Sequence, residues 1–293
     1  MAELQSNAQQ IQTVAVLGAG TMGHGIAQVC AAAGIETRLF DTEPARVTAG
    51  LDKVRANLDK GVARGKVTAE AQASTLAKLS GASDLGQAAT GADMIVEAVP
   101  EKLALKQSVF REVLQHAGSG AILATNTSSL SIDAIAEGLP APGRVIGTHF
   151  FNPVHIMKLL EIVVGPRTDE AVLASVLALG ERIGKQTIVV QDAPGFATSR
   201  LGLVIGLEAI RMVEQGVASA EDIDKAMTLG YGFPMGPLKL TDLVGLDVRL
   251  HIADHLAKEL PEGAHFSPPQ LLRTMVAEGK LGKKSGQGFY TWG

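Results

Sequence analysis

Two strand-like segments, 145–150 and 158–164, flank a short connection, and pairing them would place a histidine opposite a glutamate. If they form an antiparallel hairpin centred near His155, His149 lies across from Glu161, and directly opposed residues have Cβ atoms close enough for their side chains to hydrogen bond. A histidine held by a carboxylate is the usual arrangement of a general base, because the carboxylate fixes the tautomer and leaves the second ring nitrogen for a substrate. The competing interpretation is a polar pair on a solvated sheet face, and this pair alone does not decide between the two.

A second candidate for chemistry is a glycine-rich stretch with the spacing G-x-G-x-x-G, namely Gly18-Ala19-Gly20-Thr21-Met22-Gly23. It follows the apolar segment 13–17 and opens the helical pattern 22–33, which is the context that a dinucleotide-binding fingerprint requires. The glycines permit a tight turn, a close approach of the backbone to a pyrophosphate and close packing of the helix on the strand, while the helix N-terminus directs N–H groups at the phosphates. The stretch therefore predicts cofactor binding through Gly18, Gly20, Thr21, Met22 and Gly23.

An acid at the end of the next strand-like segment, 36–40, narrows the choice of cofactor. Asp41 would accept hydrogen bonds from both ribose hydroxyls of an adenosine, and its charge would repel a 2′-phosphate, so NAD is favoured over NADP. FAD is an open alternative because it uses the same fingerprint, and a glycine turn without any ligand is the remaining interpretation.

A polar loop, Thr125-Asn126-Thr127-Ser128-Ser129, follows the apolar segment 121–124. In open α/β sheets ligands lie at the carboxyl ends of the strands, so hydroxyl groups of this loop could hold a substrate oxygen. The other interpretation is a Ser/Thr loop that caps the helix beginning near Ile132.

The elements that must position these residues alternate between strand-like and helical patterns, which predicts a doubly wound, Rossmann-type α/β domain. Strands are expected at 13–17, 36–40, 94–96, 121–124, 145–150, 158–164 and 186–190. A charged helical stretch from Pro44 to about Leu79, with a turn near 65–68, predicts a helical hairpin inserted after the second strand, with Thr68 as the cap of its second helix. Further helices are expected at 102–116, 132–137 and 169–183.

The composition shifts at 192–195, beyond which helical patterns prevail and strand patterns are almost missing. Helices are expected at 196–214, from a capping box at Ser219, across 238–260 and at 269–278. We therefore predict two domains, a dinucleotide-binding domain over residues 1–191 and a smaller all-helical domain over residues 192–293.

The composition also argues against several functions. A net charge of −4 and a pI near 6.0 provide no basic surface for nucleic acid or an anionic membrane. The single cysteine, Cys30, lies in an apolar run and permits neither an intramolecular disulfide nor a cysteine-based zinc site, and we expect no metal. The first dozen residues lack the pattern of a signal peptide and no apolar run is long enough to cross a bilayer, so we expect a cytoplasmic protein.

Several strings together resemble one family, the L-3-hydroxyacyl-CoA dehydrogenases, and most closely its short-chain bacterial members. The resemblance runs from about Thr13 to Tyr290 and includes, beside the glycine stretch, Asn126-Thr-Ser-Ser-Leu130, His149-Phe-Phe-Asn-Pro153, Met157-Lys-Leu159, Asp192-Ala-Pro-Gly-Phe196, Pro234-Met-Gly-Pro237 and Gly286-Gln-Gly-Phe-Tyr290. It implies NAD-dependent oxidation of the 3-hydroxyl of an acyl-CoA ester to a 3-ketoacyl-CoA, or the reverse reduction. It also implies a homodimer formed through the helical domain.

The resemblance further implies a role for each matching polar position. His149 is the expected general base with Glu161 as its partner, Ser128 would hydrogen bond the reacting oxygen, and Asn152 would support the same centre. His155, where the family often has proline, is expected to be a structural turn residue.

Two further groups of residues match family positions that bind parts of the cofactor and the substrate. Glu101 and Lys106 match positions near the nicotinamide end of the cofactor site. Lys60, Arg64 and Lys66, in the predicted hairpin, lie where the family contacts the CoA phosphates, although a solvated helix face is the competing interpretation for these three.

One position departs from the family pattern. Where the family usually has an asparagine after the Pro-Gly-Phe string, this chain has Ser199, whose hydroxyl can donate and accept but has a shorter reach, which a bridging water could make up. The length of the acyl chain, including a dicarboxylic chain, is open at this point. A same-fold dehydrogenase of a free hydroxy acid, a flavin oxidoreductase and a non-catalytic NAD-binding protein are the alternative functions.

Overall fold

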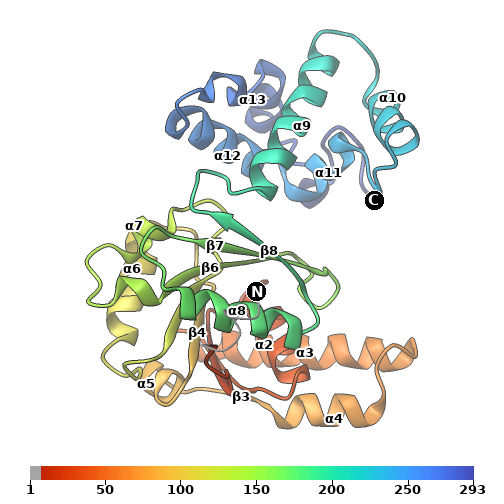
Figure 1. Cartoon of the computed structure of the whole chain (residues 1–293). Helices are drawn as coiled ribbons and strands as arrows, with labels where there is room; N and C mark the ends of the chain where they lie inside the picture. The colour runs from red at the N-terminus through yellow and green to blue at the C-terminus, as the bar shows by residue number, and fades with distance from the viewer. Residues whose placement is uncertain (1–7) are drawn as a thin grey trace. The chain divides into compact units, whose positions relative to one another are not determined.

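The chain folds into two compact units, one that ends at Ala193 and one from Pro194 to Gly293 (Figure 1). The computed structural model describes residues 8–293. The sequence placed the domain boundary after residue 191, within the segment that joins the last strand to the first helix of the second unit. Each unit has a hydrophobic cluster of its own.

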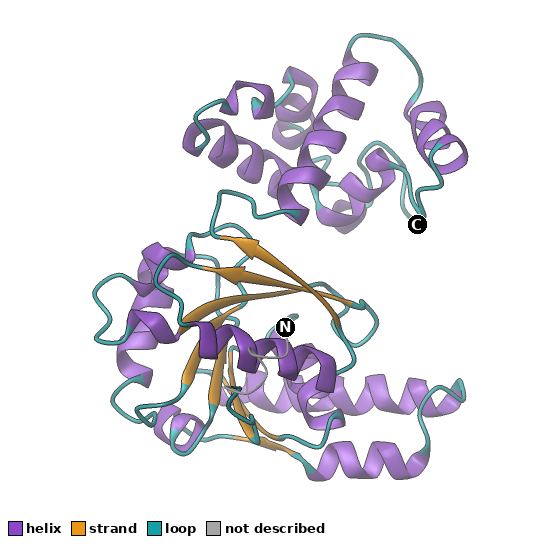
Figure 2. Cartoon of the chain, viewed as in Figure 1, coloured by secondary structure: helices purple, strands orange, loops and turns teal. Residues whose placement is uncertain are grey.

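The N-terminal unit is built on a single sheet (Figure 2). Its strands, in chain order, are β1 (Thr13–Leu17), β2 (Glu36–Phe40), β3 (Leu79–Gly81), β4 (Met94–Glu97), β5 (Ile122–Thr125), β6 (Val145–Phe150), β7 (Leu159–Val164) and β8 (Gln186–Gln191). Among the described residues they lie side by side in the order β3-β2-β1-β4-β5-β6-β7-β8, and each neighbouring pair is parallel except β6 with β7. The predicted doubly wound α/β fold is confirmed.

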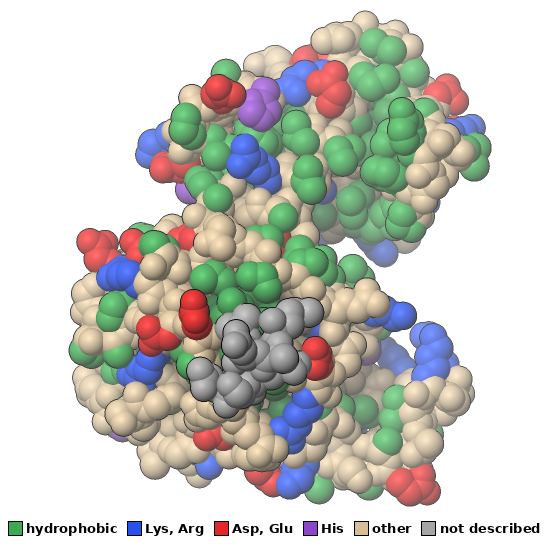
Figure 3. Space-filling model, viewed as in Figure 1, with side chains coloured by type: hydrophobic (Ala, Val, Ile, Leu, Met, Phe, Trp, Pro, Cys, Tyr) green, Lys and Arg blue, Asp and Glu red, His purple; other side chains and the backbone are tan. Residues whose placement is uncertain are grey.

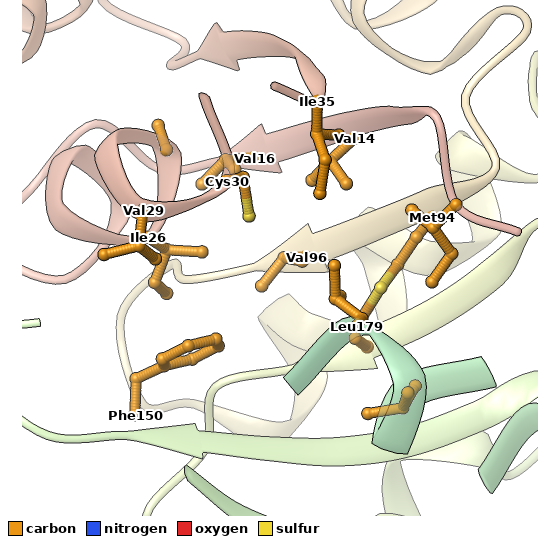
Figure 4. Packing of buried hydrophobic residues seen from close by; sticks show 14 of the residues in the cluster. Val14, Val16, Ile26, Val29, Cys30, Ile35, Met94, Val96, Phe150 and Leu179 are labelled. Atoms are coloured by element: carbon orange, nitrogen blue, oxygen red, sulfur yellow. The ribbon is translucent and has the colours of Figure 1, made fainter. Parts of the chain in front are cut away.

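Helices cover both faces of this sheet (Figure 1). They are α2 (Gly23–Ala32), α3 (Pro44–Ala63), α4 (Ala69–Ala77), α5 (Leu85–Ala89), α6 (Leu103–Val113), α7 (Ile132–Ala136) and α8 (Glu170–Arg182), with a 3-10 turn at Pro142–Arg144. Helices α2 and α8 share one hydrophobic cluster with the strands, in which Ile26 and Leu179 lie near Val96 and Phe150 (Figure 4). The cysteine Cys30 belongs to this cluster, and its burial raises the pKa of the thiol to about 12.

The inserted hairpin is present as predicted, formed by α3 and α4. Pro44 occupies the start of α3, where a missing N–H costs nothing, and the Thr68 hydroxyl accepts a hydrogen bond from the Ala71 N–H at 3.1 Å, which caps α4. Because α3 begins just after β2, the hairpin projects from the end of that strand.

The structure differs from the sequence-based prediction in three local details. The helical pattern read as far as Leu79 ends at Ala77, and β3 follows as a three-residue edge strand that is too short to show a periodic pattern. Helix α5 was not predicted, because five residues span little more than one helical turn. The long pattern at 238–260 is interrupted at Gly245, whose φ of +105° ends one helix and begins the next.

The C-terminal unit is helical throughout its described elements. It contains α9 (Thr198–Glu214), α10 (Ala220–Lys225), α11 (Pro237–Val244), α12 (Leu246–Glu259) and α13 (Gln270–Ala277), with short turns of helix at Ala226–Gly230, Gly263–Phe266 and Lys283–Ser285. The Ser219 hydroxyl accepts a hydrogen bond from the Asp222 N–H at 3.1 Å, so the predicted cap of α10 is confirmed. No helix in residues 8–293 is long and apolar enough to span a membrane.

Candidate active site

The polar segments predicted to carry chemistry meet at one edge of the sheet. Strands β1, β4, β5 and β6 are parallel, so their carboxyl ends lie at the same edge. The glycine stretch follows β1, and the next strand in the chain, β2, lies on one side of β1 while β4 lies on the other. That reversal of strand order is the switch point at which open α/β sheets bind ligands.

The glycine stretch has the geometry of a phosphate cradle. Gly18 has a φ of +99°, and a Cβ on it would lie 2.6 Å from the Ala98 carbonyl oxygen, so no larger residue fits there. A Cβ on Gly23 would lie 1.7 Å from the Gly18 oxygen, which explains why the helix can start so close to the turn. A Cβ on Gly20, by contrast, would meet nothing within 4 Å. Gly20 therefore faces open space of the kind that a pyrophosphate would need, so these residues fit a dinucleotide.

The carboxylate of Asp41 is held against the glycine stretch. Its Oδ2 accepts a hydrogen bond from the Ala19 N–H at 2.9 Å, and its Oδ1 accepts one from the Glu43 N–H at 3.2 Å. Asp41 thus lies at the end of β2 beside the glycine turn. This is the position from which an acid accepts hydrogen bonds from the adenosine ribose of a bound dinucleotide. Thr21 is exposed on the same turn, and Met22 occupies the N-cap position of α2.

A buried network of charges follows β4. The Nζ of Lys106 lies 2.8 and 3.0 Å from the two carboxylate oxygens of Glu97 and 3.1 Å from Glu101 Oε2. The Thr125 hydroxyl donates to Glu97 Oε2 at 2.6 Å, and the Val99 N–H donates to Glu97 Oε1 at 2.7 Å. Glu97 and Lys106 are fully buried, so this network fixes the loop between β4 and α6 before any ligand binds.

Glu97 was missed by the sequence analysis, which ended its strand at Val96. The signal was present, because Glu97 is an acid that directly follows three apolar residues of a buried strand. Burying a carboxylate is costly unless it is paired, so such a position calls for a nearby cation. Lys106 is that cation, one turn into the next helix.

The loop that follows β5 is organised around Glu101. Glu101 Oε1 accepts from the Thr127 hydroxyl at 2.5 Å and from the Ser128 N–H at 3.0 Å, and the Ser128 hydroxyl lies 3.4 Å away. Burial raises the pKa of Glu101, but Lys106 and these hydrogen bonds outweigh it and hold the pKa below its ordinary value. Asn126 Oδ1 accepts from the Phe150 N–H at 3.0 Å, which ties the loop to β6.

The predicted register of β6 and β7 is confirmed, with His149 directly opposite Glu161. The His149 Nδ1 and Glu161 Oε2 atoms are 2.8 Å apart. Because Glu161 is 0% and His149 8% exposed, the competing interpretation of a solvated polar pair is wrong. Nδ1 lies against the carboxylate, so proton exchange with a substrate would run through Nε2, and the Phe151 ring packs on the imidazole with centroids 4.4 Å apart.

The remaining predicted residues lie in less constrained positions. Asn152 and His155 are exposed in the connection between β6 and β7, as the turn interpretation of His155 requires. Burial, together with the positive charges of His24 and Lys185, lowers the pKa of His155. Ser199 is half-buried in the first turn of α9, in the C-terminal unit, so its part in the site stays a prediction.

Lys60, Arg64 and Lys66 are exposed at the far end of α3 and in the turn before α4. None of the three forms an ion pair with a described residue. A helix of this length spans about 30 Å, so their end of the hairpin is far from Asp41. They are thus available to bind a ligand phosphate, and a solvated helix face is equally compatible with these positions. Among residues 8–293, no group of three or more His, Cys, Asp or Glu side chains could hold a metal ion.

A Rossmann-type sheet with a glycine turn at its switch point, and a buried histidine–carboxylate pair on a neighbouring strand, define the class of an NAD-binding oxidoreductase. Residues 13–193 match the model of the 3-hydroxyacyl-CoA dehydrogenase NAD binding domain, and residues 195–292 match that of the 3-hydroxyacyl-CoA dehydrogenase C-terminal domain. The chain belongs to the 3-hydroxyacyl-CoA dehydrogenase family.

Similar proteins span nearly the whole chain. A 3-hydroxybutyryl-CoA dehydrogenase of Mycobacterium tuberculosis is 44% identical over 284 residues, which cover 96% of this chain and 99% of the relative. The 3-hydroxyadipyl-CoA dehydrogenase of Escherichia coli is 41% identical and aligns over 96% of this chain and 59% of its own length. Among solved structures, the (S)-3-hydroxybutyryl-CoA dehydrogenase PaaH1 of Ralstonia eutropha superposes with a TM-score of 0.93 at 38% identity, covering 97% of this chain and 100% of that one.

Proposed function

We propose that this chain catalyses the NAD-dependent oxidation of the 3-hydroxyl of a short-chain L-3-hydroxyacyl-CoA to the 3-ketoacyl-CoA, and the reverse reduction. The observation that carries the proposal is the buried His149–Glu161 pair, which stands on the same sheet as a glycine turn that fits a dinucleotide. The names of the relatives support the substrate class.

Each part of the cofactor would meet a different element of the sheet edge. Gly18, Gly20 and the start of α2, with Thr21 and Met22, would hold the pyrophosphate, and Asp41 would accept from the adenosine ribose. Glu101, fixed by Lys106, would orient the nicotinamide end. Bound NAD supplies the acceptor for the hydride that leaves C3 of the substrate.

The chain's own residues would manage the proton and the alignment. His149 would take the hydroxyl proton through Nε2, and Glu161 would hold the ring and stabilise the imidazolium that forms. Ser128, whose loop is anchored by Glu101 and Asn126, would hydrogen bond the reacting oxygen. Asn152 and Ser199 would support the same centre. In the reductive direction His149 would return the proton to the oxygen.

The CoA part of the substrate would be bound through its phosphates by Lys60, Arg64 and Lys66, whose charges lack a carboxylate partner among the described residues.

A homodimer through the C-terminal unit is also proposed. Its support is a set of exposed apolar side chains on α9, α11 and α12, namely Leu201, Leu240, Leu243, Val244 and Val248, and Figure 3 shows hydrophobic side chains on the surface of that unit. Light scattering would test the dimer, and cell fractionation the proposed cytoplasmic location.

The test is a spectrophotometric assay of NADH consumption with acetoacetyl-CoA, with free acetoacetate and with NADPH in place of NADH. We expect fast turnover only with NADH and the CoA ester. Turnover of the free acid would instead indicate a hydroxy-acid dehydrogenase. A purified protein that is yellow would indicate a flavin enzyme, and no turnover with any pair would overturn the proposal in favour of a non-catalytic NAD-binding protein.

A dicarboxylic 3-hydroxyacyl-CoA is a second candidate substrate, favoured by the relative from Escherichia coli that is named a 3-hydroxyadipyl-CoA dehydrogenase. The same assay with 3-oxoadipyl-CoA compares the two. A higher kcat/KM for 3-oxoadipyl-CoA than for acetoacetyl-CoA would identify the dicarboxylic ester as the preferred substrate.

A further inference from the structure

Helix α12 carries a charged residue on its buried face. The positions that α12 buries are Leu246, Arg249, Ala253 and Leu256, which recur at the spacing of one helix face. Arg249 is only 6% exposed, although it stands where the pattern calls for an aliphatic side chain. A charged side chain therefore occupies a position of the helix that should be apolar. Such departures from the apolar pattern concentrate at functional sites.

The Arg249 guanidinium has no counter-charge. It forms no ion pair with a described residue, and its buried Nε has no hydrogen-bond partner. The three acids of the same helix pair with other cations, Asp247 with Lys284, Asp254 with Arg273 and Glu259 with Lys258. Burial without compensation lowers the pKa of Arg249 to about 10. A buried cation in this state is costly until an oxygen or an anion pairs with it.

The packing of α12 on α9 places this cation near Ser199. A Cβ on Gly202 would lie 3.6 Å from Arg249 Nη1, and a Cβ on Gly195 would lie 3.0 Å from the methyl groups of Leu256. The later residue of 195–202 contacts the earlier residue of α12, and the earlier residue contacts the later one. Helix α12 therefore runs antiparallel to 195–202. Ser199 lies between these two contacts and one helical turn before Gly202, on the same side of α9.

We propose that Arg249 is a substrate-binding residue, whose buried guanidinium binds an oxygen atom of the acyl group next to Ser199. The inference rests on the proposed function, in which Ser199 supports the reacting centre. A single cation that shares its helix face with the buried apolar residues Leu246, Ala253 and Leu256 suits an acyl chain with one polar group. It does not suit the several charges of the CoA phosphates. The oxygen is either one that every substrate has, at C3 or in the thioester, or the terminal carboxylate of a dicarboxylic chain.

The test compares Arg249→Met and Arg249→Lys with the wild type, using acetoacetyl-CoA and 3-oxoadipyl-CoA with NADH. Arg273→Met, which removes an exposed arginine of the same unit, is the matched control. Loss of a charge-assisted hydrogen bond should lower the kcat/KM of Arg249→Met about 10- to 100-fold. The lysine variant should fall less, and the dissociation constant for NADH should stay within about twofold.

The two substrates identify the oxygen. An equal loss with both esters assigns the guanidinium to an oxygen common to all substrates, and a loss confined to 3-oxoadipyl-CoA assigns it to the terminal carboxylate. Either outcome supports the proposal.

Thermal unfolding without ligand separates binding from a structural role. Because Arg249→Met removes an uncompensated buried charge, its melting temperature should equal or exceed that of the wild type. A lower melting temperature together with equal losses of activity and NADH binding would overturn the proposal, as would unchanged kinetics with both esters. A wild type that is inactive with both esters would overturn the proposed function itself, whereas an active wild type with an equally active Arg249→Met variant would overturn the inference alone.

Discussion

The buried charges of the N-terminal site and one buried charge of the C-terminal unit are handled in opposite ways. In the N-terminal unit, Glu97, Lys106 and Glu161 are fully buried, and each has a charged or hydrogen-bonding partner in the same unit at 2.8 to 3.1 Å. In the C-terminal unit, Arg249 is buried to a similar degree without one. The first arrangement holds its side chains in place before a ligand binds. In the proposed role of Arg249 a ligand completes the second arrangement, so the comparison separates preorganised chemistry from substrate recognition.

The largest effect is expected from the preorganised side, at His149. His149→Ala removes the proposed base while Glu161 stays in place, and we expect kcat to fall about 10²- to 10⁴-fold, the usual range for lost acid–base catalysis. The dissociation constant for NADH, measured by fluorescence, should change little because His149 is not on the glycine turn. His155→Ala, an exposed histidine of the adjacent connection, is the control and should keep kcat within about twofold. Normal turnover of His149→Ala would remove it from the mechanism.

The next effect is on stability and tests the same, preorganised half of the comparison. Lys106→Met takes the shared cation away from Glu97 and Glu101, and breaking a buried ion pair from one side costs about 3–5 kcal/mol of unfolding free energy. Urea denaturation measures this loss. The control is Lys78→Met, which removes a half-exposed lysine that pairs with Glu36 and should cost about 1 kcal/mol or less. If both variants lost equally little unfolding free energy, Lys106 would not be the cation that compensates the buried charge of Glu97.

The sequence predicted the arrangements that depend on local pattern. An antiparallel hairpin centred near His155 was enough to place His149 opposite Glu161, because the register of a hairpin follows from its connection. The glycine spacing was likewise enough for the turn after β1. Both features are set by residues close together in the chain or by the period of a strand.

What the sequence did not predict depends on contacts between distant segments. The acid at the end of β4 could have been noticed, but the string Met94 to Glu97 does not reveal that Thr125, on another strand, completes its hydrogen bonds. The unusual state of Arg249 depends on such contacts too, since an arginine on a helix is ordinarily solvated, whereas this one is 6% exposed with its Nη1 close to Gly202 of α9. Edge strand β3 was too short for any period to be seen.

The smallest effect is expected at Asp41, which lies between the two cases of the comparison. Each oxygen of its carboxylate accepts one hydrogen bond within the unit, from the Ala19 and Glu43 N–H groups. The hydroxyls of a cofactor ribose would donate the remaining hydrogen bonds. Asp41→Asn keeps an acceptor oxygen and removes the charge, so the kcat/KM with NADH should fall only about 10-fold, or about 1.4 kcal/mol. Because the repulsion of a 2′-phosphate is also removed, the ratio of kcat/KM for NADH over NADPH should fall by more than that. An unchanged ratio would mean that the carboxylate serves the glycine turn alone, and Asp41 would then belong with Glu97 as a residue that organises the site without touching the cofactor.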